Sequence, residues 1–186
     1  MVHQKIDHDF KNDQLSYDAK PNYQPCVKLS FWFNKLPEVS YEQFHRHWET
    51  VHADLTIATK DFGVCKVQRY VQFHQTPEMK ERAKSLGLEH LDFDGCSEIW
   101  VKSWEDWERF YKVLRPLTVV LPSQTTDTDQ IEQSEDYAKT LGPDCKHFMK
   151  MPIHVAVGCE NLIFGEALPG MGGKDGVTAE NVKVRS

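Results

Sequence analysis

Histidine interrupts the apolar face of a helix that the sequence predicts between residues 40 and 62. At about 100° per residue, His45 and His52 fall in one sector with the apolar side chains of this segment. A buried imidazole needs a hydrogen-bond partner, and an imidazole with a partner can exchange a proton near neutral pH. We therefore interpret His52 as a candidate general acid and base. The apolar members of the sector are Tyr41, Phe44, Trp48 and Leu55.

His45 precedes His52 by seven residues, or about 10 Å along a helix axis. Because metal–nitrogen bonds are about 2 Å long, one ion cannot bridge both rings, and packing is the simpler role for His45. A site made of two histidines and a carboxylate, from His52, His154 and Glu98, has no close ligand spacing. Glycine-rich nucleotide-binding motifs are also missing from the sequence. We expect neither a metal nor a cofactor.

Two strand residues are candidate partners of His52 in catalysis. Glu98 alternates with Cys96 and Trp100, and it could orient His52, pair with Lys28, act as a second acid, or face solvent. Tyr70 lies on the polar face of its predicted strand, where its hydroxyl could stabilise an enolate oxygen or bind a phenol. Simple packing of the ring is the other interpretation of Tyr70.

Tryptophans and polar residues at strand positions are predicted to form the walls of a pocket for flat aromatic rings. Indole rings bury well against aromatic ligands, although a tryptophan in a helix or strand is more often part of the core. His47, His90 and His147 are interpreted as surface residues. The candidate substrate-binding residues are Trp48, Trp100, Lys28, Trp32, His154 and His74.

The order of the predicted elements is strand, helix, strand, then strand, helix, strand, which is a split βαβ pattern. Ser40 and Gln43 form a capping box at the start of the first helix, and Phe62-Gly63 ends it. Ser103 caps the second helix, whose inner stripe is expected to hold Trp104, Trp107, Tyr111 and Leu114. The predicted fold class is α+β, ferredoxin-like, with a four-stranded antiparallel sheet. The predicted strands are 26–33, 64–74, 95–102 and 151–158, and a short surface helix is expected at 77–88.

The chain divides into an N-terminal arm, one domain and a C-terminal tail. Residues 1–25 are polar and without periodicity, residues 26–165 carry the predicted elements, and residues 166–186 are glycine-rich and expected to be flexible. A polar insertion occupies about residues 117–142, with a helix expected near 130–141. The apolar residues of the predicted strands point to both faces of the sheet. The two predicted helices can cover only one face. A second copy of the sheet is the natural cover, so we expect a homodimer with a dimeric α+β barrel.

Composition excludes several classes of protein. The net charge is −6 and the basic residues are scattered, which argues against a nucleic-acid partner. No segment reaches the roughly 18 consecutive apolar residues of a membrane helix. Five cysteines without C-x-x-C spacing favour reduced thiols, and we expect a cytoplasmic protein.

Four motifs carry a resemblance to a known family. They are Phe44-x-x-x-Trp48-x-x-x-His52-Ala53-x-Leu55, then Tyr70, then Asp94-Gly95-x-x-Glu98-Ile99-Trp100, then Pro143-Asp144-Cys145-Lys146-His147-Phe148. The chain from about residue 27 to 165 resembles the EthD-like family of small dimeric α+β-barrel proteins. The chain departs from the family at Asp54, where the family often has proline, and in the length of the insertion.

The resemblance implies a dehydratase, decarboxylase or cyclase of fungal polyketide biosynthesis, with a small-molecule cavity between helices and sheet. The expected function is a cofactor-independent lyase or cyclase acting on an aromatic polyketide intermediate, with His52 as general acid and base and Glu98 and Tyr70 as its partners. Two alternatives stay open: a cofactor-free oxygenase that acts on an anthrone, and a non-catalytic protein that binds a small molecule. The family is catalytically diverse, so the reaction itself is not determined.

Overall fold

The computed structural model describes residues 6–114 and 139–184 of the chain. These residues form two compact units. One unit combines the two ends of the chain, Met1–Cys26 and Cys159–Ser186, and the other runs from Val27 to Gly158. The expected helix near 130–141 falls almost entirely outside the described residues, as does most of the polar insertion.

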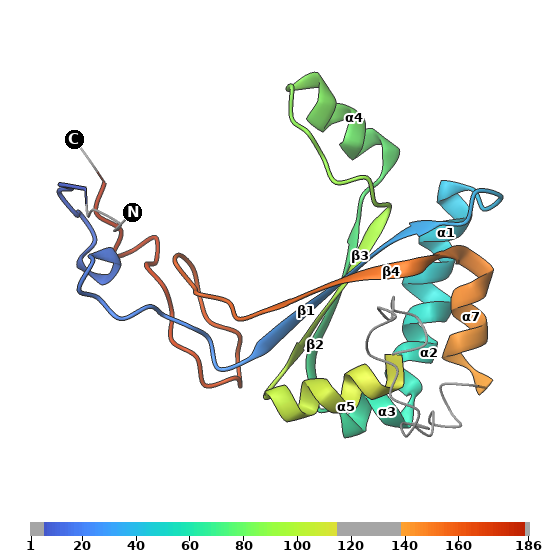
Figure 1. Ribbon diagram of the computed structural model, residues 1–186. Helices are drawn as coiled ribbons and strands as arrows, with labels where there is room; N and C mark the ends of the chain where they lie inside the picture. The colour runs from blue at the N-terminus through green and yellow to red at the C-terminus, as the bar shows by residue number, and fades with distance from the viewer. Residues whose placement is uncertain (1–5, 115–138, 185–186) are drawn as a thin grey trace, which may run out of the picture. The chain divides into compact units, whose positions relative to one another are not determined.

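The second unit is built on a four-stranded antiparallel sheet (Figure 1). Its strands are β1 (Val27–Lys35), β2 (Val67–His74), β3 (Gly95–Val101) and β4 (Met149–Gly158), in the order β2-β3-β1-β4. Every neighbouring pair is antiparallel. This is the strand order of a ferredoxin-like fold, so the predicted fold class is confirmed.

Helices of this unit cover one face of the sheet, and the core lies between these helices and the sheet. Along β1, Leu29, Phe31 and Phe33 are buried and alternate with less buried residues. The register sets Leu29 opposite Ile99, so the two side chains share the helix-covered face. Figure 1 shows α1, α2, α3, α5 and α7 on this side of the strands. The helices contribute to the core Phe44, Trp48, Trp107, Leu141, Cys145 and Phe148.

The first predicted helix exists, but it is divided into four pieces. They are α1 (Tyr41–His47), the π-helical turn η2 (Trp48–His52), α2 (Ala53–Ala58) and α3 (Lys60–Val64). The capping box is confirmed, because the Ser40 hydroxyl accepts from the Gln43 N–H and the Gln43 side chain accepts from the Ser40 N–H. The break falls at Thr59, which is extended (ψ 142°) and donates its hydroxyl to the Thr56 carbonyl at 2.8 Å.

The described residues of the unit form three further helices: α4 (Pro77–Ser85), α5 (Trp104–Leu114) and α7 (Leu141–Phe148). Ser103 caps α5, as predicted, by accepting from the Asp106 N–H. Trp107 is buried, but the expectation of an inward Trp104 was wrong, because its indole is exposed and donates to Glu108 along the surface. The side chains of Tyr111 and Leu114 lie outside the described part. Helix α7 was not predicted, and it supplies part of the site below.

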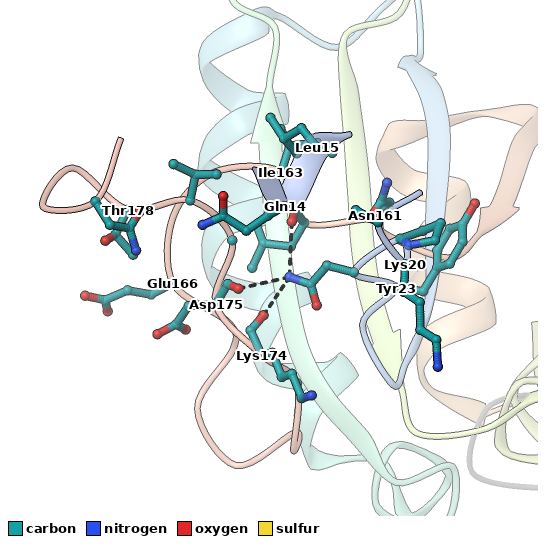
Figure 2. A pocket seen from close by; sticks show the side chains of 18 of the residues that line it. Gln14, Leu15, Lys20, Tyr23, Asn161, Ile163, Glu166, Lys174, Asp175 and Thr178 are labelled. Carbon is teal, nitrogen blue, oxygen red and sulfur yellow. Dashed lines mark hydrogen bonds between the residues drawn. The ribbon is translucent and has the colours of Figure 1, made fainter. Parts of the chain in front are cut away.

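The unit formed by the chain ends is held together by long-range hydrogen bonds rather than by regular structure. The Gln24 N–H donates to the Glu160 carbonyl at 2.8 Å, and the Leu162 N–H donates to the Asn22 carbonyl at 3.0 Å. Asn22 also donates its side-chain amide to the carbonyls of Lys174 and Asp175. The partners are more than 130 residues apart, so no local pattern could predict the pairing of the arm with the tail. Residues of this unit line an open pocket of about 1290 Å³ (Figure 2).

None of the helices within residues 6–114 and 139–184 is both long enough and apolar enough to cross a membrane.

Candidate active site

His52 forms a buried pair with an acidic residue that the sequence analysis did not single out. The Nδ1 atom of His52 lies 2.8 Å from Oδ2 of Asp144, and the two side chains are 7% and 8% exposed. A carboxylate can only accept a hydrogen bond, so Nδ1 carries the proton and Nε2 of the neutral ring has the free lone pair. The Phe148 ring packs edge-on against the imidazole at 5.0 Å between centroids. This arrangement prepares Nε2 of His52 to accept a proton.

The second oxygen of the same carboxylate binds a second histidine. Oδ1 of Asp144 lies 2.7 Å from Nε2 of His47, whose side chain is 30% exposed. Burial alone would raise the pKa of Asp144, but the hydrogen bonds from His52 and then His47 outweigh it, and the pKa is lowered. Asp144 is therefore ionised at neutral pH. The interpretation of His47 as a simple surface residue missed this bond.

The π-helical turn explains how two histidines five residues apart reach one carboxylate. In an α-helix, residues five apart point about 140° away from each other around the axis. The i→i+5 bonding of a π turn adds residues to each turn and brings such positions closer to one side. The turn spans Trp48–His52, immediately after His47, and it lies against α7. Such turns occur often at functional sites.

A cavity of about 580 Å³ lies next to His47 on the outside of this helix pair. Val39, Val51 and Phe148 supply apolar wall, and Arg46 and His147 supply polar groups. His47 lines the cavity and His52 is not among its lining residues, and Asp144 binds both rings. The carboxylate thus connects a solvent-accessible imidazole to a buried one.

The polar face of β2 points toward the helices, on the same side of the sheet as the buried core. The register places Tyr70 opposite Ile99 and Gln72 opposite Ser97, which are helix-facing positions. The Gln72 amide donates to the Trp48 carbonyl at 2.8 Å and to the Tyr70 hydroxyl at 2.9 Å. Burial raises the pKa of Tyr70, and hydrogen bonds, chiefly with Gln72, only partly oppose it. Tyr70 is therefore a neutral phenol that can donate a hydrogen bond.

His74 continues this polar row and meets His45. Their Nδ1 atoms are 2.7 Å apart, and Nε2 of His74 lies 3.2 Å from the Gln72 carbonyl oxygen. The His74 ring also packs against Trp48, at 4.3 Å between centroids. Burial lowers the pKa of both histidines, so both rings are neutral at pH 7. His45, which the sequence suggested as a packing residue, is thus part of a hydrogen-bonded chain.

Glu98 lies on the opposite face of the sheet from His52 and Tyr70. It pairs in register with Ser30, one position out of phase with the buried Leu29 and Phe31. Its carboxylate binds the Lys28 ammonium at 2.7 Å, with the two side chains 22% and 26% exposed. Of the roles open to Glu98, the structure shows the ion pair with Lys28. The sheet separates it from His52, so the two do not form one constellation.

Four other candidate residues share the Glu98 face: Lys28, Trp100, Trp32 and His154. The Lys28 ammonium lies 4.8 Å from the centre of the Trp100 ring, and Arg69 lies on the same ring at 5.0 Å. Trp32 is opposite His154 in register, and Phe93 lies between them, at 5.9 Å and 5.3 Å between ring centroids. The predicted site residues therefore divide into two sets. One set is His52, Tyr70, Trp48 and His74, and the other is Glu98, Lys28, Trp100, Trp32 and His154.

Within the described ranges, no group of three or more histidine, cysteine, aspartate or glutamate side chains has an arrangement that could hold a metal ion. The acid that partners His52 comes from a segment nearly a hundred residues away. The only signal for Asp144 in the sequence was its place in the motif Pro143–Phe148, before the last strand.

The unit is of the ferredoxin-like α+β class, and comparison with known proteins narrows this description. Residues 36–113 match the model of the EthD domain family. This range holds η2 and His52, Tyr70 and the whole of β3, but it ends before Asp144.

Two solved structures resemble the chain at low identity. One is an EthD family protein from Bacillus halodurans, with 17% identity, a TM-score of 0.40, and coverage of 73% of this chain and 98% of that one. The other is described as a dimeric protein of unknown function with a ferredoxin-like fold, from Bacteroides fragilis. It has 10% identity, a TM-score of 0.37, and coverage of 75% and 99%. A search of curated proteins finds no match.

Proposed function

We propose that this protein is a cofactor-independent lyase or cyclase that acts on an aromatic polyketide intermediate, with His52 as the proton carrier. The observation that carries the proposal is the buried hydrogen bond between His52 Nδ1 and Asp144 Oδ2, at 2.8 Å. Residues 36–113 match the EthD domain, and the proposed substrate class rests on the resemblance of the sequence to the EthD-like proteins of fungal polyketide pathways.

In this proposal the reaction is a proton transfer next to a carbonyl group. In a dehydration, Nε2 of His52 would take the proton alpha to the carbonyl and return it to the departing hydroxyl group. Asp144 would stabilise the imidazolium between these two steps, because it is ionised and bound to the other nitrogen. In a decarboxylation, Nε2 would take the proton of the substrate's carboxylic acid, the C–C bond of the resulting carboxylate would break to release carbon dioxide, and the same nitrogen would return the proton to the carbanion carbon of the enolate. In both reactions the Tyr70 phenol would donate to the enolate oxygen.

The first experiment measures turnover of an anthrone-type carboxylic acid by His52→Gln, His52→Ala and Asp144→Asn. We expect kcat/KM to fall by about 10² to 10⁴ for the His52 variants, which is the usual contribution of general acid–base catalysis. Asp144→Asn should cause a smaller loss, because the imidazole remains but its imidazolium is no longer paired. His90→Gln, in the connection before β3, is the matched control.

Unchanged turnover by folded His52 variants would remove His52 from the mechanism. Product mass and oxygen uptake identify the reaction, because a lyase loses water or carbon dioxide whereas an oxygenase consumes O2. A co-purifying pigment with no turnover of any such substrate would favour the non-catalytic binding protein.

We also propose that the sheet face opposite the helices packs against a second copy of the chain. This face carries Trp32 and Phe73, whose rings touch at 6.1 Å between centroids, and Phe73 is 48% exposed. The Lys28–Glu98 ion pair lies on the same face and is partly exposed. Exposed aromatic side chains on a sheet face that no helix covers are a candidate interaction site.

A further inference from the structure

His47 lines the cavity of about 580 Å³ beside α1 and α7, and one of its ring nitrogens is open to a ligand. Its Nε2 atom lies 2.7 Å from Oδ1 of Asp144, so in the neutral ring Nδ1 carries the lone pair. Within the described part of the chain, Nδ1 of His47 has no hydrogen-bond partner. It is also not one of the buried polar atoms without a partner, which are Nε2 of His45 and Nε1 of Trp48. Nδ1 of His47 is therefore an acceptor that a molecule from solvent can reach.

Asp144 fixes this nitrogen of His47 as the acceptor. Burial would raise the pKa of Asp144, but the hydrogen bonds from His52 and then His47 lower it, so the carboxylate is ionised at neutral pH. An ionised carboxylate has no proton to donate, so the N–H of the neutral His47 ring must be at Nε2. The Phe148 ring packs against the imidazole at 4.9 Å between centroids. The tautomer and the position of the His47 ring are therefore both set before any ligand binds.

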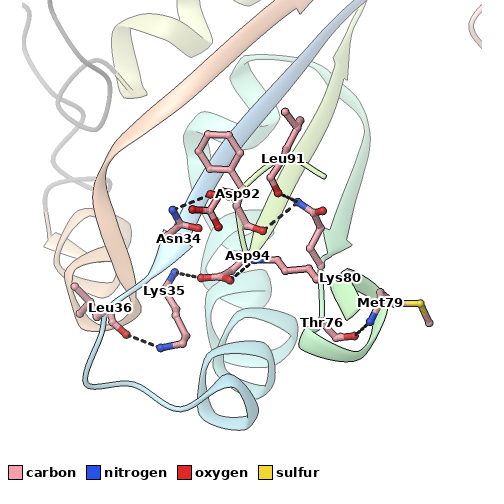
Figure 3. A network of polar contacts seen from close by, with 11 residues as sticks. Asn34, Lys35, Leu36, Thr76, Met79, Lys80, Leu91, Asp92 and Asp94 are labelled. Atoms are coloured by element: carbon pink, nitrogen blue, oxygen red, sulfur yellow. Dashed lines mark hydrogen bonds and ion pairs between the residues drawn. The ribbon is translucent and has the colours of Figure 1, made fainter. Parts of the chain in front are cut away.

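Asp94, a second buried aspartate with a lowered pKa, is bound in a different way. It accepts from the Lys35 N–H at 3.0 Å and from the Lys80 ammonium at 2.8 Å (Figure 3). A backbone N–H and an ammonium have no lone pair, so these two partners of Asp94 offer no acceptor to a ligand. The imidazole partners of Asp144 each keep a second nitrogen. Of the two, His47 is the one that lines the cavity.

The wall around His47 suits a molecule with an apolar body. Val39 from the segment before α1, Val51 from η2 and Phe148 from the end of α7 all line the cavity. Three separate segments thus supply apolar surface on the side of the ring that Asp144 does not occupy. A volume of about 580 Å³ lies within the range of small-molecule sites, about 300–1,000 Å³. A flat ring is favoured because it can pack against the Phe148 ring.

The charges near the cavity favour a neutral ligand over an anion. Asp144 is ionised, and the carboxyl group of Glu38 also lines the cavity. Arg46 is the lining residue with a permanent positive charge, but its guanidinium already binds the Glu49 carboxylate at 3.2 Å. His147 from α7 is exposed at the rim. An anionic ligand would meet two carboxylates and a cation that is already paired, whereas a neutral hydroxyl group needs only the lone pair of Nδ1.

We propose that the cavity beside His47 binds a neutral phenol, whose hydroxyl group donates a hydrogen bond to Nδ1 of His47 and whose ring packs on Val39, Val51 and Phe148. The inference goes beyond the proposed function, because it assigns a ligand to the solvent-facing ring of the Asp144 pair and requires no turnover. The buried ring of His52 takes no part in the binding except through Asp144.

The first test titrates the wild-type protein with 4-methylphenol at about pH 8, above the ordinary pKa of histidine. Nitrogen-15 NMR of labelled histidine should show the free His47 ring protonated at Nε2 only. Added 4-methylphenol should shift the Nδ1 resonance of His47 with a Kd on the order of 1 mM, as expected for so small a ligand. A proton on Nδ1 of the free protein, or no shift of this resonance up to the solubility of the phenol, would overturn the proposal.

Two matched ligands test the chemistry of the bound group. 4-Methylanisole has the same ring without an O–H donor, and 4-methylbenzoate carries a negative charge. Each should bind to wild type about three- to tenfold more weakly than 4-methylphenol, the usual effect of one hydrogen bond. Equal binding of 4-methylanisole would exclude the hydrogen bond to Nδ1. Tighter binding of 4-methylbenzoate would make the cavity an anion site and overturn the proposal.

Two variants test the place of binding by ligand-observed proton NMR. His47→Phe keeps a ring against Phe148 but removes the nitrogen, so the preference for 4-methylphenol over 4-methylanisole should disappear. Val51→Trp should fill the cavity and abolish binding of both ligands. Val64→Trp is the matched control, because Val64 is an exposed valine of α3 that does not line the cavity. A preference that survives in His47→Phe, or binding that survives in Val51→Trp, would overturn the proposal. The titrations of wild type stand without any variant.

The His52→Gln variant separates this inference from the proposed function. It should bind 4-methylphenol like the wild type, because His47 keeps its bond to Asp144. A loss of binding in His52→Gln as large as in His47→Phe would place the ligand at His52 and contradict the inference. Binding at His47 by a wild-type protein that turns over no polyketide substrate would support the inference and contradict the proposed function.

Discussion

Asp144 determines the chemistry of two histidines through one carboxylate. Each of its oxygens accepts from a different ring, so both imidazoles present an N–H to the acid and a lone pair away from it. The two rings differ in burial rather than in partner, because His52 is 7% exposed and His47 is 30% exposed. A single residue thus fixes the tautomers of the proposed proton carrier and of its solvent-facing neighbour.

The lowered pKa of Asp144 predicts how stability depends on pH. A group whose pKa is lower in the folded state stabilises the fold above its unfolded pKa, about 4 for aspartate, and this contribution is lost as the pH falls through its folded pKa. At neutral pH, Asp144→Asn should reduce the free energy of unfolding by about 2 kcal/mol, the usual range for hydrogen bonds to a charged group. Urea unfolding between pH 7 and pH 3 measures the difference.

The difference in the free energy of unfolding between wild type and Asp144→Asn should narrow below about pH 4, because Asp144 of the unfolded chain then takes up a proton while the folded carboxylate, with its lower pKa, still excludes it. Asp94→Asn provides a comparison, since Asp94 also has a lowered pKa, against the effect of burial and through Lys80. A difference in the free energy of unfolding that stays constant between pH 7 and pH 3 would contradict this account of Asp144.

At the scale of elements, the π-helical turn packs closely against β3 at Gly95. The Trp48 indole is fully buried and lies where a side chain at position 95 would be. A Cβ atom there would come within 2.6 Å of the Trp48 ring at Cη2. The carbonyl of Trp48 also accepts from Gln72, so displacement of the indole would disturb both the core and the hydrogen-bonded chain.

Gly95→Ala should therefore lower the free energy of unfolding by about 1–3 kcal/mol, the usual cost of overpacking a core. The indole cannot move aside easily, because Phe33 and Phe44 pack against it. Chemical denaturation with tryptophan fluorescence measures both the loss of stability and the displaced ring. Gly63→Ala is the matched control, as nothing lies within 4 Å of a Cβ at that position. Equal effects of the two substitutions would contradict the proposed clash.

Features whose sequence signal lies in neighbouring residues were predicted, whereas features that depend on packing between distant segments were not. The capping box at Ser40 and the alternation along β1 depend on neighbouring residues, and both were predicted. The π turn depends on packing against α7, and α7 is a short helix with only a moderate apolar pattern. Neither was visible in the periodicity of the sequence.

At the scale of the whole molecule, the two faces of the sheet differ in what covers them. Helices bury one face, and the other presents Trp32, Phe73 and a partly exposed ion pair. We expect the wild-type chain to have twice the mass of one 21.6 kDa protomer in solution. Light scattering measures this mass. A stable monomer would contradict the proposed pairing of sheets.

Phe73→Glu should shift the dimer toward monomer, because it would place a charge in an apolar interface. Val64→Glu is the matched control, since Val64 is equally apolar and 61% exposed but lies at the end of α3 in the helical layer. Both variants should keep their secondary structure by circular dichroism. Dissociation by Val64→Glu alone would assign the contact to the helical layer instead.

The sequence by itself determined the order of strands and helices, the ferredoxin-like class, and the presence of a histidine inside an apolar helix face. These follow from short-range patterns, because apolar periodicity and caps are properties of neighbouring residues. Only the tertiary structure decided which candidates meet. Period-two alternation defines two faces of a strand but not which face the helices cover, so the sequence could not separate Glu98 from His52. Asp144 reaches His52, and His45 reaches His74, across 92 and 29 residues, because folding brings distant elements together.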